Sequence, residues 1–199
     1  KDELTTLQSL INAENLGKID MYFRTPLHIA CHKGLDELIP IMLEKMDQKI
    51  IEQEDIHFYT PYHLACQKGH ENIAINIIES KKMNVDYVDI NGNTLLHIAC
   101  TNKLENLAKI LIGKMSCLDI PNKYNRTPLH IACYKKMDEL ASCLVLLGCT
   151  NHQDINGYTP LMICKKNKMN EMFIYLFIIH KLLYTDKSFQ YVQLKLNEF

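Results

Sequence analysis

The chain has 199 residues, of which 47% are hydrophobic and 23% are charged, and its formal net charge at pH 7 is −1. This length and composition are those of a globular protein that can bury a substantial core. The near-zero charge excludes the strongly basic character of many nucleic-acid-binding domains and of proteins that coat anionic membranes. A preference for a charged partner would therefore have to come from local patches.

The cysteines and the apolar segments indicate the cellular compartment of the protein and whether it inserts into a membrane. None of the eight cysteines forms a C-x-x-C pair, and the chain is too large to need a disulfide framework. The first 20 residues contain no apolar signal-peptide core, and the most apolar stretch, residues 172–183, is too short to span a bilayer. We therefore expect reduced thiols, a cytoplasmic location and no insertion into a membrane.

The first expected element is a helix over residues 2–16, in which Leu4, Leu7, Leu10 and Ile11 follow helical spacing. A string related to TPLHIAC then begins five times, at intervals of 35, 34, 33 and 32 residues. The five copies begin at Thr25, Thr60, Thr94, Thr127 and Thr159. Such regular spacing indicates an internal repeat.

Each copy has the residue types of a helix N-terminus. Threonine is a good N-cap and proline is favoured at the first helical position. A histidine at the third position, such as His28, can bond back to the cap threonine, as Glu or Gln does in a capping box. Leu27, Ala30 and Cys31 then follow helical spacing and define the buried face.

A turn and a second helix follow each first helix. Gly34 and Gly69 are expected to end the first helix in the left-handed conformation, and Lys103, Lys136 and Asn167 replace this glycine in the later copies. The apolar periodicity predicts second helices over residues 35–45, 70–80, 104–114, 137–147 and 169–183, with Pro40 in the first turn of the earliest. Turn-rich segments, such as residues 89–93 with their Asn-Gly pair, predict a hairpin between one copy and the next.

The first two hairpins depart from this pattern. Glycine occupies the hairpin position at 92 and 157, and Asn125 is a fair substitute, but Phe23 and Phe58 stand there in the first two copies. Because phenylalanine tolerates a positive φ poorly, we expect these two hairpins to have a different geometry.

These motifs and their period resemble those of the ankyrin-repeat family, whose pattern D-x-x-G-x-T-P-L-H-x-A covers roughly residues 20–184. The resemblance implies an all-α ankyrin-repeat solenoid, with stacked helix-turn-helix units joined by β-hairpin-like loops. The expected boundaries are a cap helix or partial repeat at 1–19, repeats at 20–54, 55–88, 89–121, 122–153 and 154–184, and a tail at 185–199 that could act as a C-terminal cap.

The paired histidines and cysteines suggest two kinds of chemistry that the repeat disfavours. Zinc needs four ligands that converge on one point, whereas stacked helices about 8–10 Å apart place His beside His and Cys beside Cys in separate columns. A catalytic thiolate is partly exposed, whereas these cysteines are predicted to be buried in a column of Cys31, Cys66, Cys100, Cys133 and Cys164. We therefore expect no metal, no cofactor and no enzymatic activity.

A binding surface is the third interpretation. In the family, the hairpin tips and the ends of the first helices line a concave face that contacts protein partners. By position, the tips contribute Tyr22, Arg24, His57, Tyr59, Asn91, Asn93, Tyr124, Arg126 and Tyr158. The helix ends contribute His32, Lys33, Gln67, Lys68, Asn102, Tyr134, Lys135, Lys165 and Lys166. The recurring lysines at the helix ends either complement the helix dipole or form a basic stripe that selects an acidic partner.

The sequence thus predicts a non-catalytic scaffold that binds a protein partner on its concave face, and not nucleic acid. A regulatory or substrate-targeting module of a larger enzyme, such as a ubiquitin-ligase adaptor or an acyltransferase, is the alternative. Thiol-based sensing by Cys117, Cys143 or Cys149 is a third and weaker hypothesis. The apolar second helix of the last copy needs a cover. The tail, a following domain or another chain could supply it.

Overall fold

We describe the protein from a computed structural model, in which residues 13–80, 83–169, 174–175 and 178 are placed. The chain divides into two compact units, Lys1–Met115 and Ser116–Phe199. Within the part of the chain that is placed, the regular structure is helical, apart from one isolated antiparallel bridge between Val88 and Thr94. The fold is therefore all-α, as the sequence predicts.

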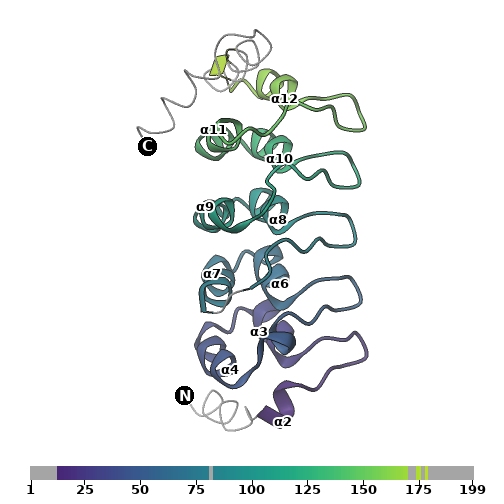
Figure 1. The fold of residues 1–199 in the computed structure, drawn as a ribbon, viewed down its shortest axis with the longest axis vertical. Coiled ribbons are helices and arrows are strands. Elements are labelled where there is room, and N and C mark those ends of the chain that lie inside the picture. The colour runs from purple at the N-terminus through teal and green to yellow at the C-terminus, as the bar shows by residue number, and fades with distance from the viewer. Residues whose placement is uncertain (1–12, 81–82, 170–173, 176–177, 179–199) are drawn as a thin grey trace. The chain divides into compact units, whose positions relative to one another are not determined.

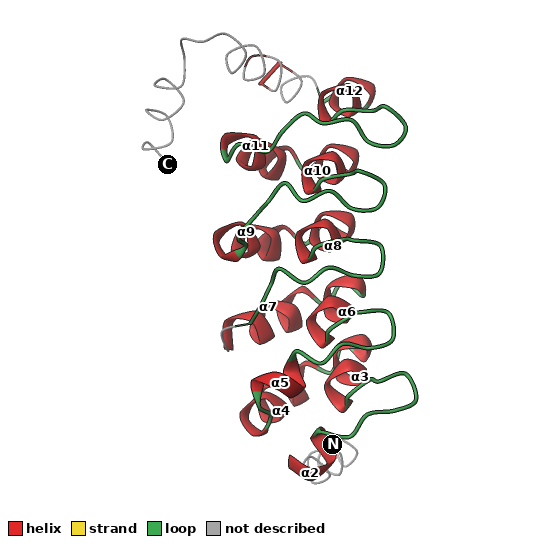
Figure 2. Cartoon of the chain, turned by 45° about the vertical axis from the view of Figure 1, so that its right-hand side comes forward, coloured by secondary structure: helices red, strands yellow, loops and turns green. Residues whose placement is uncertain are grey.

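The first unit consists of two layers of helices with hairpins beside one layer (Figures 1 and 2). The inner layer, next to the hairpins, contains α3 (Pro26–Lys33), α6 (Pro61–Gln67) and α8 (Leu95–Asn102). The outer layer contains α4 (Ile39–Lys45), α7 (Glu71–Ser80) and α9 (Glu105–Lys114). A short helix α2 (Ala13–Leu16), a 3₁₀ turn at Asp36–Leu38 and α5 (Gln48–Ile51) complete the unit. Contacts along each layer join α3 to α6, α6 to α8, and α4 to α7.

The second unit repeats the same arrangement. Helix α10 (Pro128–Lys135) contacts both α11 (Asp138–Leu146) and α12 (Pro160–Lys166). The helix expected over residues 169–183 and the tail at 185–199 lie outside the described residues, apart from positions 169, 174, 175 and 178. The same is true of most of the helix expected over residues 2–16.

The predicted histidine cap forms at the start of the first helices. Thr25 donates its backbone N–H to Nδ1 of His28 at 3.0 Å, and its hydroxyl oxygen lies 2.8 Å from the same nitrogen. The pairs Thr60–His63, Thr94–His97 and Thr127–His130 are arranged in the same way. In the last copy Met162 replaces the histidine, and Thr159 Oγ1 accepts the backbone N–H of Met162 directly at 3.2 Å.

The core lies between the two layers of each unit. Leu27, Ala30 and Cys31 are buried, as the helical spacing predicts. The predicted cysteine column is wrong at one position. Counted from the N-cap Thr159, Cys164 takes the place of the preceding alanines, and the exposed Lys165 takes the place of the cysteines. Cys164 is nevertheless fully buried, because a small thiol fits where an alanine fits.

The prediction that Phe23 and Phe58 change the hairpin geometry is wrong. Both residues adopt the left-handed conformation, with φ of 58° and 61°, as do Gly92, Asn125 and Gly157. An aspartate explains this, because in the first hairpin Asp20 Oδ1 accepts the backbone N–H groups of Tyr22 and Arg24 at 2.9 and 3.0 Å. The Phe23 N–H also donates to the Asp20 carbonyl at 2.9 Å. These bonds outweigh a left-handed penalty of about 1–2 kcal/mol.

The turns after the first helices follow the prediction except in the last copy. Gly34, Gly69, Lys103 and Lys136 have positive φ, as expected. Asn167 does not, because its φ is −85°, and the left-handed residue is Lys168. Lys168 lies nine positions after Thr159, the same count as from Thr25 to Gly34. The ten residues after α4 contain the further short helix α5, which the sequence did not predict.

Helices long and apolar enough to cross a membrane do not occur in the described ranges.

Candidate partner-binding surface

The hairpins of the first unit are held side by side by backbone hydrogen bonds. The Ile56 N–H donates to the Tyr22 carbonyl at 3.1 Å, and the Ile90 N–H donates to the His57 carbonyl at 3.3 Å. Each hairpin is closed internally by the aspartate arrangement described for Asp20. Predicted site residues from three repeats therefore lie on one continuous surface.

The hairpins and inner helices of the first two repeats enclose a hollow of about 290 Å³. Its walls are formed by Tyr22, Arg24, His32, Asp55, Ile56, His57, Tyr59, Leu64, Gln67 and Lys68. The sequence prediction includes all of these except Asp55, Ile56 and Leu64. Ile56 and Leu64 were missed because that prediction favoured polar and aromatic side chains, although Ile56 is 41% exposed.

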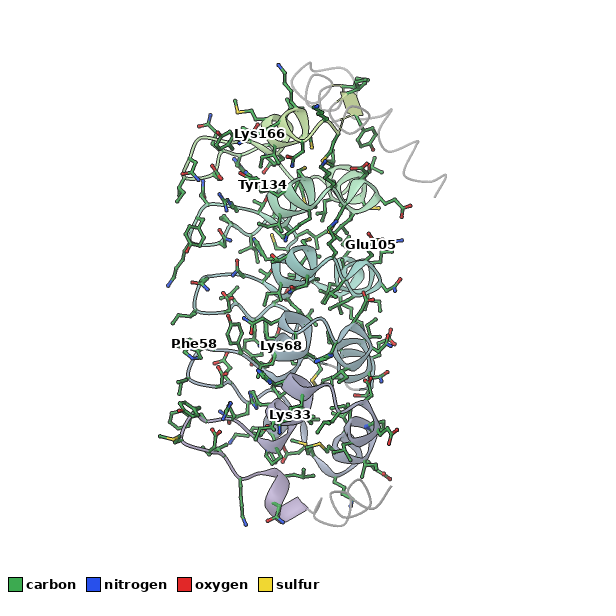
Figure 3. All side chains as sticks on the ribbon, turned by 180° about the vertical axis from the view of Figure 1, so that it is seen from behind. Lys33, Phe58, Lys68, Glu105, Tyr134 and Lys166 are labelled. Carbon is green, nitrogen blue, oxygen red and sulfur yellow. The ribbon has the colours of Figure 1, made fainter. Side chains whose placement is uncertain are left out.

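Two cationic side chains, Arg24 and Lys68, and the carboxylate of Asp55 line the hollow. Burial, followed by the nearby positive charges of Lys68 and Arg24, lowers the pKa of His32, so the imidazole is neutral at pH 7. Arg24 bonds through Nη2 to Asp20 Oδ2 at 2.6 Å, and its guanidinium carbon lies 4.9 Å from the centre of the Tyr22 ring. Figure 3 shows Lys33 and Lys68 on the inner helices of this unit.

Tyr59 connects the hollow to the third hairpin. Gln67 donates through Nε2 to the Tyr59 hydroxyl at 3.3 Å, and that hydroxyl donates to Asp89 Oδ2 at 3.4 Å. Burial and the negative charge of Asp89 raise the pKa of Tyr59, so the phenol keeps its proton. The chain of bonds holds the Tyr59 ring in place.

Two predicted residues of the third repeat make bonds within the fold. Asn93 donates through Nδ2 to Asp89 Oδ2 at 3.0 Å, which stabilises its own hairpin. Asn102 donates through Nδ2 to the Cys66 carbonyl at 3.1 Å and thereby caps the end of α6. Asn91 is exposed at the hairpin tip.

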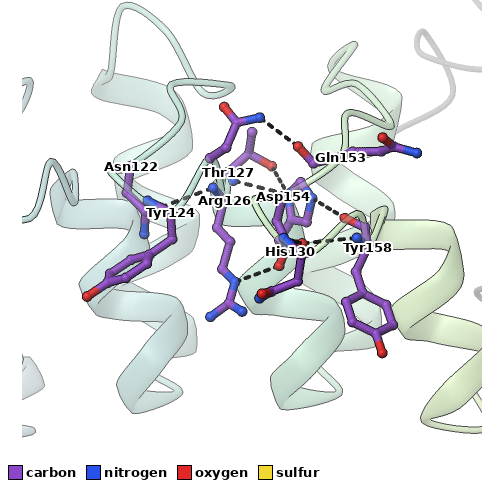
Figure 4. Close-up of polar contacts among 10 residues, drawn as sticks. Asn122, Tyr124, Arg126, Thr127, His130, Gln153, Asp154 and Tyr158 are labelled. Carbon is purple, nitrogen blue, oxygen red and sulfur yellow. Dashed lines mark hydrogen bonds and ion pairs between the residues drawn. The ribbon is translucent and has the colours of Figure 1, made fainter.

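In the second unit, Arg126 joins two successive hairpins (Figure 4). It donates through Nε to Asp154 Oδ2 at 2.9 Å, and its guanidinium carbon lies 5.3 Å from the centre of the Tyr134 ring. Desolvation of Asp154 raises its pKa, but the bonds from Arg126 and the Tyr158 backbone N–H outweigh this and lower it. The carboxylate is therefore charged at neutral pH and pairs with Arg126.

The remaining predicted residues of the second unit lie in its hairpins and at the ends of its first helices. Lys166 Nζ lies 5.1 Å from the centre of the Tyr158 ring, and Lys165 is exposed beside it in α12. Tyr124 is 49% exposed at its hairpin, and Lys135 is partly exposed at the end of α10.

A sequence model of ankyrin repeats, built from three copies, matches residues 1–86, 48–120, 76–154 and 115–188. Together these matches cover residues 1–188 of the 199. The chain belongs to the ankyrin-repeat family. Ankyrin repeats generally act as protein–protein interaction modules.

Two of the cap histidines, His28 and His130, use both ring nitrogens within the fold. Both ring nitrogens of His28 are bonded, Nδ1 to Thr25 and Nε2 to the Tyr59 carbonyl at 3.0 Å. His130 bonds in the same way to Thr127 and to the Tyr158 carbonyl at 3.3 Å. A neutral ring that accepts at Nδ1 and donates at Nε2 has no lone pair left for a metal.

The ankyrin-repeat cysteines are of two kinds. Burial raises the pKa of the Cys31 and Cys66 thiols, which keeps them protonated and unreactive. Cys117 and Cys143 are exposed, and burial raises the pKa of Cys149 to about 12. Groups of three or more side chains that could hold a metal ion do not occur among the described positions.

Proposed function

We propose that this ankyrin-repeat chain is a non-catalytic scaffold that binds a protein partner through the hollow of its first unit. The observation that carries the proposal is the convergence of seven predicted binding residues from two repeats on one hollow of about 290 Å³. Its walls combine tyrosine and arginine, which are enriched at interface hot spots, with the apolar side chains of Ile56 and Leu64.

We further propose that the partner presents an acidic segment to this hollow. Lys68 is exposed on the wall of the hollow, whereas Arg24 there is already paired with Asp20 at 2.6 Å. A glutamate or aspartate of the partner would be attracted to Lys68, while Tyr22 and Tyr59 would pack against its stem. Such local charge selects a partner even though the chain as a whole has a net charge of −1.

A displayed library of random 12-residue peptides tests both parts of the proposal. We expect the wild-type protein to enrich acidic peptides from the library. The variant Lys68→Glu should bind the selected peptide about tenfold more weakly, because a close positive charge is replaced by a negative one. Lys114→Glu is the matched control, because Lys114 is also an exposed lysine at a helix end of the first unit, but in the outer layer. Unchanged affinity in Lys68→Glu, or equal loss in Lys114→Glu, would contradict the proposal.

A further inference from the structure

Two aromatic side chains occupy positions in the first unit that neither the backbone nor the core requires. Phe23 and Phe58 lie two residues before the N-cap threonine and have φ of 58° and 61°. Elsewhere in this chain the same position is filled by Gly92, Asn125 or Gly157, which adopt this conformation more easily. The two phenylalanines are 53% and 51% exposed, so they gain little from burial.

Further exposed apolar side chains lie on the first three hairpins. Met21, Ile56 and Ile90 occupy equivalent positions, four residues before the N-cap, and are 83%, 41% and 44% exposed. The backbone bonds from Ile56 to Tyr22 and from Ile90 to His57 hold the three hairpins together. We call Met21, Phe23, Ile56, Phe58 and Ile90 the tip strip. It meets the hollow at Ile56, and Figure 3 shows Phe58 at the far end of its hairpin, away from Lys33 and Lys68.

The second and third hairpins are acidic, whereas the first carries Lys18 as well as Arg24. Residues 52–59 and 84–93 contain no lysine or arginine but include Glu54 and Asp86. In the first hairpin, the charge of Arg24 is paired with that of Asp20 at 2.6 Å. An anionic membrane surface would therefore be repelled, whereas a cationic protein segment would be attracted.

We propose that the tip strip binds an amphipathic, basic helix of a partner protein. The apolar face of this helix lies across the two phenyl rings, and its lysines and arginines face the carboxylates of the second and third hairpins. Three neighbouring hairpins span two repeat intervals of about 10 Å each, which a helix of roughly 13 residues can cover at 1.5 Å per residue. Partner helices in other complexes are recognised in this way, through apolar residues that recur every three or four positions on one face.

Two synthetic peptides of 14 residues test this proposal directly. Both carry leucine at helical spacing on one face, and the other face is lysine in one peptide and glutamate in its counterpart. We expect the leucine–lysine peptide to bind the wild-type chain, and the double variant Phe23→Asn, Phe58→Asn to bind it at least tenfold more weakly. Asparagine is chosen because the chain itself uses Asn125 at this position. Binding of the leucine–glutamate peptide should depend on Lys68 and not on the two phenylalanines.

The controls separate the tip strip from a structural role and from the hollow. Ile155→Asn removes another exposed hairpin side chain, 63% exposed in the second unit, and should leave peptide binding unchanged. Lys68→Glu should not weaken binding of the leucine–lysine peptide. The proposal for the tip strip and the proposal for the hollow can therefore be contradicted independently. The double phenylalanine variant should melt at the same or a higher temperature than wild type.

Several results would overturn the proposal. One is equal binding of the leucine–lysine peptide to wild type and the double variant, and another is a lower melting temperature of that variant. Binding to vesicles of phosphatidylcholine and phosphatidylserine at 3:1 that depends on the phenylalanines would assign the tip strip to a membrane. Self-association in sedimentation that depends on them would assign it to a second copy of the chain.

Discussion

A neutral, buried histidine stabilises the start of each of four first helices. It accepts from the cap threonine, and in His28 and His130 it also donates to a carbonyl at the hairpin of the next repeat. Desolvation lowers the pKa of both rings, and it lowers the pKa of the fully buried His63 to about 4. The same side chain therefore links a helix cap, repeat stacking and the pH dependence of stability.

Stability should fall as the pH is lowered from 6.5 towards 4. In this range the unfolded His63 binds a proton at its ordinary pKa of 6.5, while the folded side chain remains neutral. His63 alone should remove about 2 kcal/mol of unfolding free energy between about pH 7.5 and pH 5, given 1.36 kcal/mol per pKa unit. Urea unfolding at several pH values measures this loss.

The variant His63→Gln distinguishes this cause from general acid denaturation. Glutamine can still occupy the third position of a capping box, but it does not titrate. Its unfolding free energy should depend less steeply on pH than that of the wild type over the same range. Identical slopes would show that His63 does not titrate as its burial implies.

Two glycines with the same role at the ends of α3 and α6 should differ in sensitivity to substitution. Gly34 and Gly69 both have positive φ, so alanine at either position costs about 1 kcal/mol. A Cβ at Gly34 would also lie 2.6 Å from Cε1 of His70, whereas a Cβ at Gly69 meets nothing within 4 Å. Denaturant unfolding should therefore show a larger loss for Gly34→Ala than for Gly69→Ala.

A double-mutant cycle with His70→Ala identifies the contact responsible. In the His70→Ala background the two glycine substitutions should cost nearly the same, because only the backbone penalty remains. If the difference between them persists without the imidazole, the contact with His70 is not its source.

At the scale of elements, local residue chemistry was sufficient to predict the first helices and their N-caps, but not α5 or the left-handed residue of the last turn. The threonine–proline start, the histidine at the third position and the apolar spacing act within one turn, so each copy could be interpreted alone. The hairpins of Phe23 and Phe58 were mispredicted for a physical reason. Side-chain propensity was weighed, but the bonds that Asp20 accepts from Tyr22 and Arg24 were not.

The candidate site was only partly predictable for a related reason. Position in the repeat identified Tyr59, Gln67 and Lys68, which the structure brings together. It did not show that Asn93 and Asn102 bond within the fold, because their partners Asp89 and Cys66 are found only once the repeats are stacked. The apolar part of the hollow needs three-dimensional information of the same kind.

At the scale of the whole chain, a net charge of −1 conceals local surfaces of opposite character. In the first unit, Lys68 and Arg24 border the hollow, while the second and third hairpins carry carboxylates. The hollow lies in the first two repeats, and the tip strip extends over the first three hairpins. A partner with an acidic segment followed by a basic amphipathic helix would therefore match the first unit in charge along its length.

Repeat architecture also predicts how far the destabilising effect of one substitution extends along the chain. Each repeat packs mainly on its neighbours, so stability is close to a sum of local terms. The reactivity of five buried cysteines measures local unfolding, with Cys31, Cys66 and Cys100 in the first unit and Cys133 and Cys164 in the second.

The variant Gly34→Ala tests whether a local loss of stability stays local. Pulsed thiol labelling of this variant in rising urea should modify Cys31 and Cys66 at lower urea concentrations than Cys133 and Cys164. The exposed Cys117 and Cys143 should label without urea and serve as internal controls. If all five buried thiols became reactive at one urea concentration, the chain would unfold as a single cooperative unit and this expectation would be wrong.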